Sequence, residues 1–286
     1  MVLINLKDLL AEAKRKEYGV MATIAFNFDS AEAVIEAAEE KISPVILMTS
    51  EPLFKYFNFE KLAEPMIAMA KEAKVPVAIS FDHGKNKNLI MRCIERGFPS
   101  VMFDGSTLPL DENIKAVKEI IKKAHPLGVS VEGEVGVVAG LEGDVAHKVM
   151  DPGSDHLTRP EDAVRFVKET DVDALAISAG TVHGLFTSKP DIDFERISKI
   201  RDAIETPLVL HGCSGLSDRD FKKIIKCGVT KINYYSNLLL EATDKAKEIA
   251  NSGEDINYME LNYRVMQAFK NAVKIKMDVF GSSGKG

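Results

Sequence analysis

Apolar and polar positions along the chain follow two alternating patterns. Short apolar runs are typical of strands buried on both faces, and the segments between them place apolar residues every three to four positions, as in amphipathic helices. After a first helix at 6–16, capped by Asn5, the pair of patterns occurs eight times. The predicted strands are 20–28, 44–49, 76–84, 100–104, 129–135, 174–179, 208–210 and 231–235.

The predicted helices fill the intervals between these strands. One is capped by Ser30 and runs to Glu40, and a long helix at 259–279 comes last. The others cover 59–73, 86–96, 110–125 and 160–169 or begin near residues 193, 217 and 237. Eight strand–helix units in about 250 residues predict an α/β fold, a (β/α)8 TIM barrel with extra N- and C-terminal helices. We expect a single domain over residues 1–286. A doubly wound open sheet is the alternative, but regular spacing and the lack of a GxGxxG motif weigh against it.

Composition narrows the range of partners. The chain is 45% hydrophobic and 28% charged, as ordinary globular proteins are, and its net charge of -6 with a pI near 5.6 argues against a general nucleic-acid binder. Neither a signal peptide nor an apolar span long enough for a membrane occurs, and the three cysteines show no CxxC spacing. We therefore expect a cytoplasmic protein without a nucleic-acid or membrane partner.

Three predicted strands end in a histidine followed by glycine, at His83, His183 and His211. With 6 His and 19 Gly in 286 residues, chance gives about 0.4 such pairs. Any one of them alone is more simply a histidine hydrogen-bonded at a strand end. Because parallel strands of a barrel open their carboxyl ends onto one site, the three together favour a three-histidine metal centre with an open coordination position.

Other polar residues stand at the same strand ends. Asp82 would point away from the neighbouring ligand unless the chain turns there, a placement that suits a proton carrier. The long loop 136–158 carries Glu142 and has the length of a lid. The remaining polar residues expected at the mouth are Asn27, Asp29, Asp104, Glu132, Glu134, Ser214, Asn233 and Ser236.

Five motifs resemble one enzyme family over nearly the whole chain, from about Leu6 to Lys285. They are the sequences at 82–84, 104–106, 131–136, 180–184 and 211–215, which match in order and spacing the class II zinc-dependent ketose-bisphosphate aldolases. The closing residues 280–285 resemble the tagatose-bisphosphate-like branch. The resemblance implies reversible cleavage of a phosphorylated ketose into dihydroxyacetone phosphate and an aldehyde through a zinc-stabilised enediolate.

The resemblance also implies a role for each matching residue. His83, His183 and His211 would hold Zn2+, and a monovalent cation such as Na+ or K+ is compatible with the family. Asp82 would carry the proton of the hydroxyl at the bond being broken, and Glu142 the proton at the ketone carbon. The further implied residues are Asp104 and Glu134 at a second metal position, Gly184, Gly212, Ser214 and Ser236 at the phosphate, and Asn233 at the enediolate. A homodimer or homotetramer is expected.

The departures from the family pattern concern residues that hold substrate. Thr187 stands where a lysine is usual, and Lys189 is the nearest replacement. Tyr235 stands in place of an aspartate, and Asp29 in place of an asparagine. The metal and proton-transfer residues are kept, which favours an active aldolase on an altered substrate. The alternatives are a zinc-dependent sugar-phosphate epimerase or isomerase, and a non-catalytic barrel subunit that supports another aldolase.

Overall fold

The computed structural model describes residues 3–140, 148–149, 156–186 and 190–286. Eight parallel strands close into a barrel in the order β1-β10-β9-β7-β5-β4-β3-β2, which confirms the predicted (β/α)8 architecture. The barrel strands are β1 (Val20–Ile24), β2 (Val45–Ser50), β3 (Val77–Gly84), β4 (Ser100–Phe103), β5 (Ser130–Val135), β7 (Ala174–Ile177), β9 (Leu208–Leu210) and β10 (Val229–Asn233). A separate two-stranded sheet pairs β6 (Lys148–Val149) with β8 (Leu185–Phe186).

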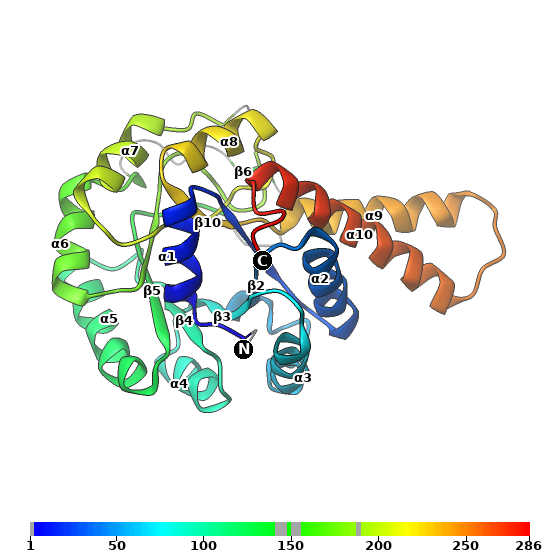
Figure 1. The fold of residues 1–286 in the computed structure, drawn as a ribbon, viewed down its shortest axis with the longest axis horizontal. Helices are drawn as coiled ribbons and strands as arrows, with labels where there is room; N and C mark the ends of the chain where they lie inside the picture. Colours follow the sequence, from blue (N-terminus) through cyan, green and yellow to red (C-terminus); the bar gives the residue numbers. More distant parts are fainter. Residues whose placement is uncertain (1–2, 141–147, 150–155, 187–189) are drawn as a thin grey trace.

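Helices surround the barrel, and the last two extend away from it as a pair (Figure 1). Short 3-10 turns, η1 (Glu51–Leu53) and η2 (His125–Leu127), follow β2 and α5. The helices are α1 (Leu6–Lys16), α2 (Phe28–Lys41), α3 (Phe59–Glu72), α4 (Lys87–Glu95), α5 (Leu110–Ala124), α6 (Pro160–Thr170), α7 (Phe194–Ala203), α8 (Asp218–Lys226), α9 (Ser236–Asn251) and α10 (Tyr258–Phe280). Within the described part of the chain, no helix has the length and apolar character needed to cross a membrane.

Helix α1 closes the amino end of the barrel. Its apolar residues recur at helical spacing and are all buried, namely Leu6, Leu9, Leu10 and Ala13. The amides of Leu6 and Lys7, which lack partners inside a first helical turn, donate to the hydroxyls of Ser100 and Ser130 at 3.0 and 3.1 Å. Packing and capping thus fix α1 against the starts of β4 and β5.

Strand alternation divides the core into two parts. Outward-facing residues such as Val45 and Ile79 pack with the surrounding helices, whereas inward-facing residues such as Ala22, Ile46 and Val209 form a cluster inside the barrel that continues to α1. This inner cluster fills the barrel near its amino end. The carboxyl end is where polar side chains enter the interior.

The first strand is shorter than predicted, and the cap of its helix was assigned to the wrong residue. Strand β1 ends at Ile24, and Asn27 caps α2 by accepting a hydrogen bond from the Ser30 amide at 2.8 Å. Ser30 is the third helical residue, and its hydroxyl accepts from the Asn27 amide in return, so two otherwise unpaired amides are satisfied. Asn27 is therefore a cap, and Asp29 lies in the first turn of α2, where it accepts from Asn262 at 2.7 Å.

The last strand is also displaced from its predicted position. It covers Val229–Asn233 and not 231–235, and Tyr235 occupies the cap position of α9. The sequence pattern failed here because β10 contains an irregularity between Val229 and Lys231 that breaks strict alternation.

Candidate active site

Three histidines converge at the carboxyl end of the barrel. His83 is the next-to-last residue of β3, His183 follows β7 and His211 follows β9, and all three are buried. Their ring centroids are 4.7, 4.6 and 5.9 Å apart, and one nitrogen of each lies within 4.8 Å of the others. Three imidazoles in this arrangement form a donor set suited to Zn2+.

The end of β3 turns so that two consecutive side chains enter the site. The pairing of β3 with β4 shifts by one residue between Phe81 and Gly84, and His83 has a left-handed backbone with φ 49°. Such a conformation costs a non-glycine residue about 1–3 kcal/mol, so the surroundings must enforce it. At Gly84 a side chain would meet the Met102 carbonyl oxygen at 2.7 Å, so strands β3 and β4 approach closely. For Asp82 to face the mouth together with His83, the chain has to turn at the end of this strand. The bulge supplies that turn.

His211 is held by a carboxylate on the far side of its ring. Its Nε2 lies 2.8 Å from Glu132 Oε1, and its Nδ1 lies 3.0 Å from His83 Nε2. Burial raises the pKa of Glu132, but the Lys231 ammonium and the His211 ring outweigh burial and bring it below its usual value. An ionised Glu132 only accepts, so His211 Nε2 carries the proton and Nδ1 offers a lone pair toward His83. Two ring nitrogens at this distance can bind a shared cation when both offer lone pairs.

Asp82 lies beside the histidines with no exposed surface. The Asn233 amide nitrogen is 3.4 and 3.3 Å from its two oxygens, and His83 Nε2 is 3.7 Å away. The same amide nitrogen is 3.2 Å from His211 Nδ1. A carboxylate this close to the candidate ligands can exchange a proton with a substrate oxygen bound among them.

A second cluster joins His83, Asp104 and Glu134. Asp104 Oδ2 lies 3.3 Å from His83 Nδ1. Burial raises the pKa of Asp104, but His83, the Ser106 hydroxyl and the Lys85 charge together hold it below its usual range. Burial, followed by the Asp104 charge, raises the pKa of Glu134 to about 7. Asp104 and Glu134 are the residues that the resemblance implies for a second metal position, and that role stays a prediction.

The expected phosphate-binding residues lie at the adjoining ends of β7, β9 and β10. The Asn237 amide donates to the Ser214 hydroxyl at 3.4 Å, which sets Ser214 against the start of α9, where Ser236 is the first residue. Gly212 has φ 66°, and a side chain there would meet the His183 amide nitrogen at 2.9 Å. Gly184 also has a positive φ, of 84°. Glu142, Thr187 and Lys189 lie outside the described residues.

The sequence reasoning missed two residues of the site. Lys231 was treated only as the start of a strand, although a lysine within an apolar strand of a barrel is itself a signal of a buried ion pair. Ser50 was not singled out either. It pairs in register with Asp82, and its buried hydroxyl has no hydrogen-bond partner among the residues that the structure describes. Side chains alternate along a strand, so Ser50 lies on the same inner face as Met48. This alternation was the sequence signal that could have identified Ser50.

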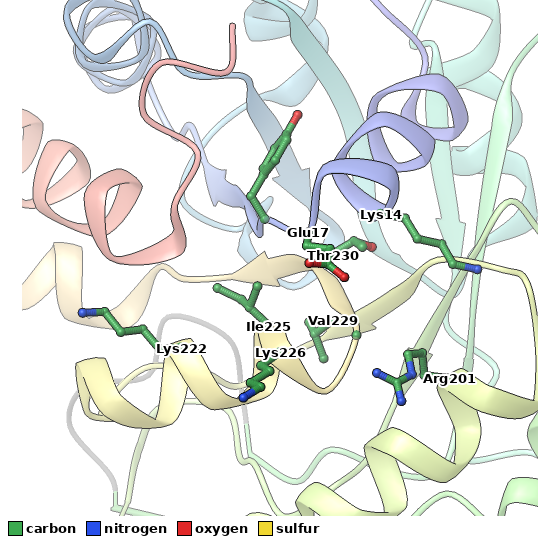
Figure 2. A pocket seen from close by; sticks show the side chains of 10 residues that line it. Lys14, Glu17, Arg201, Lys222, Ile225, Lys226, Val229 and Thr230 are labelled. Carbon is green, nitrogen blue, oxygen red and sulfur yellow. The ribbon is translucent and has the colours of Figure 1, made fainter.

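A well-formed cavity lies far from these residues. Its volume is about 620 Å³, and it lies at the amino ends of the strands between α1, α7 and α8 (Figure 2). Basic side chains line it, but Lys14 pairs with Glu205 at 2.8 Å and Arg201 with Asp202 at 2.7 Å. The histidine centre is therefore identified by its chemistry and not by the size of a cavity.

Comparisons with known proteins cover nearly the whole chain. The sequence model of the class-II fructose-bisphosphate aldolases matches residues 4–285. Escherichia coli (strain K12) YdjI is 36% identical over 274 residues, 96% of each chain. The crystal structure of the YdjI aldolase from Escherichia coli K12 superimposes with a TM-score of 0.88 and 35% identity over 99% of both chains.

More distant structures share the same barrel. A putative fructose-1,6-biphosphate aldolase from Coccidioides immitis has a TM-score of 0.86 at 28% identity, covering 98% of this chain and 97% of that one. Fructose-bisphosphate aldolase from Campylobacter jejuni has a TM-score of 0.80 at 22% identity, covering 99% and 97%, and supports the fold alone.

Proposed function

Since the chain belongs to the class-II fructose-bisphosphate aldolase family and is an aldolase, we propose that it reversibly cleaves a phosphorylated ketose. The products are dihydroxyacetone phosphate and an aldehyde, and the substrate is a fructose- or tagatose-bisphosphate-like sugar or a variant of it. The observation that carries the proposal is the meeting of three buried imidazoles with Asp82 at one end of the barrel.

His83, His183 and His211 are proposed to hold Zn2+. Bound there, the ion supplies a Lewis acid that polarises the ketone oxygen and stabilises negative charge as the carbon–carbon bond breaks. Glu132 orients His211, and Asn233 lies beside both His211 and Asp82, so the chain fixes the ligands before substrate arrives. Asp104 and Glu134 form the proposed second metal position beside His83.

Asp82 is the proposed proton carrier at the bond that breaks. In the cleavage direction its carboxylate takes the proton of the hydroxyl on the aldehyde fragment, and that oxygen forms the new carbonyl. The electron pair of the broken carbon–carbon bond stays on the ketone fragment, whose carbon is then protonated. By family correspondence Glu142 supplies that proton. The burial of Asp82 excludes water from the transfer.

The phosphate of the ketone is proposed to bind at the ends of β7, β9 and β10. Gly184 and Gly212 would donate backbone amides, Ser214 and Ser236 would donate hydroxyls, and Lys189 would supply the charge that Thr187 lacks. A monovalent cation, Na+ or K+, is proposed to support this region. We further propose a cytoplasmic homodimer or homotetramer of single-domain chains.

A panel of phosphorylated ketoses tests the proposal directly. Each is incubated with the enzyme, and dihydroxyacetone phosphate is measured after metal removal and again after zinc is restored. We expect at least one ketose to release it only when metal is present. Turnover that persists after the metal is removed would reject the metal mechanism. Conversion of a ketose into an epimer or isomer without triose release would support the sugar-phosphate epimerase or isomerase.

A further inference from the structure

Lys231 is a buried cation inside the barrel. It has no exposed surface, and its Nζ lies 2.7 Å from Glu132 Oε2 and 3.9 Å from Asp82 Oδ1. A buried ammonium is costly unless it is paired and hydrogen-bonded, so its position beneath the histidines calls for a reason. In the described residues the other buried lysine, Lys270, pairs with Glu36 on the outer helices at 2.7 Å.

A bulge in β10 is what brings Lys231 inside. Val229 pairs with Leu208 and Lys231 pairs with Val209, so two residues of β10 advance against one of β9. Val229 and Ile232 pack outward with the helices, whereas Lys231 faces the interior beside Val209. Without the bulge, regular alternation through Thr230 would place Lys231 on the same outer face as Val229. The fold thus departs from regular pairing to deliver this ammonium.

The buried ammonium begins a chain of contacts that ends at a candidate ligand. Lys231 Nζ donates to one oxygen of Glu132 at 2.7 Å, and the other oxygen lies 2.8 Å from His211 Nε2. All three side chains are fully buried. Because Glu132 is fixed at both oxygens, the His211 ring is fixed in orientation and in the position of its proton. Its Nδ1 then faces His83 Nε2 at 3.0 Å.

We propose that Lys231 is a positioning residue for the metal centre, which acts through Glu132 to hold His211 with its Nδ1 lone pair directed at the ion. The inference rests on the proposed function, because it takes His211 as a metal ligand. Partners that orient ligating histidines in this way commonly change metal affinity by about 10–100-fold when removed.

The test measures the zinc dissociation constant by competition with a chromophoric chelator. Lys231→Met removes the ammonium and keeps the length of the side chain, and Glu132→Gln keeps the shape of its partner. Each is expected to weaken zinc binding by about 10–100-fold. The double variant should bind zinc as tightly as the single variant with the lower zinc affinity, since both residues act through His211. Lys270→Met, which removes a buried lysine ion pair elsewhere, should leave the constant unchanged.

A second readout needs no metal. In the zinc-free protein with ¹⁵N-labelled histidine, NMR reports which ring nitrogen of His211 carries the proton, with His211→Ala assigning the signal. We expect the proton on Nε2 in the wild type and a mixture of tautomers in Lys231→Met.

The outcomes separate this inference from the proposed function. If His211 in the wild type carries its proton on Nδ1, the inference is overturned. This result does not depend on the variants, so it holds even if a variant fails to fold. Folded Lys231→Met or Glu132→Gln with wild-type zinc affinity also overturns it, while leaving the aldolase proposal intact. A wild type that binds no zinc would instead reject the metal assignment, and the tautomer would still be measurable.

Discussion

Two buried aspartates at opposite ends of the barrel show how its two ends differ. At the amino end, Asp173 accepts from the Val131 amide at 2.8 Å, lies 2.9 Å from His125 Nε2 and pairs with Lys7 at 3.1 Å. At the carboxyl end, the Asn233 amide nitrogen lies 3.3 Å from an oxygen of Asp82 and the Lys231 ammonium lies 3.9 Å away. Asp173 links α1 and the η2 turn to β5. Asp82 instead lies among candidate metal ligands.

This difference separates stability from chemistry within one fold. The amino end is closed by the apolar face of α1, and its ion pairs, such as Lys14 with Glu205, are largely at the surface. The carboxyl end buries three imidazoles, two glutamates and a lysine, at a cost that only mutual pairing or a bound ion offsets. Barrels generally place their reactions at this end.

Loss of the proposed metal ligands should have the largest effect. Alanine at His83, His183 or His211 should abolish zinc binding and aldol cleavage, because each removes one of three donor nitrogens. Zinc content and triose release measure this, and EDTA should reproduce it in the wild type. His125→Ala is the matched control at the amino end and should retain both. Equimolar zinc in any of the three variants would remove that histidine from the centre.

Asp82→Asn should come next, with kcat lowered by about 10²–10⁴-fold while zinc is retained, because only proton transfer is lost. The substitution preserves the size of the side chain and an acceptor for Asn233. Asp173→Asn provides the comparison, since it should lower the free energy of unfolding and leave kcat unchanged. Near-native turnover of Asp82→Asn would assign proton transfer to another group.

A core substitution at the amino end should affect stability alone. Leu10→Ala removes a fully buried side chain of α1 and should lower the free energy of unfolding by about 2–5 kcal/mol. Urea unfolding of the zinc-free protein measures the loss. Because α1 lies at the opposite end, the zinc dissociation constant should not change. A parallel loss of zinc affinity would show that the two ends are coupled.

The smallest effect is expected in the basic cavity of Figure 2. Lys14→Met breaks an exposed pair with Glu205, and exposed pairs contribute little to stability. Neither kcat nor zinc affinity should change. Altered kinetics in this variant would give the amino-end cavity a part in the reaction and weaken the contrast between the ends.

Much of the architecture could be predicted because it depends on local patterns. The eight strand–helix units were confirmed, as were the Asn5 cap and the long last helix, since each rests on apolar periodicity or on a side chain that bonds a nearby amide. The predicted end of the first strand was wrong because the hydrogen bonds between Asn27 and Ser30 start a helix where the strand was expected to continue. The sequence indicated a helix cap in this segment but assigned it to Ser30 instead of Asn27.

The sequence alone determined that the three histidines and Asp82 gather at the carboxyl end, because parallel strands that close a barrel must bring their ends together. It missed Ser50 and Lys231. It could not determine how the residues at this end face one another. The turn at His83 and the bulge before Lys231 are shifts in strand pairing, set by neighbours that lie on other strands. Likewise, Glu132 binds Lys231 and His211 across 99 and 79 residues. Such contacts depend on the closed barrel and its low-dielectric interior, so only the tertiary structure decided them.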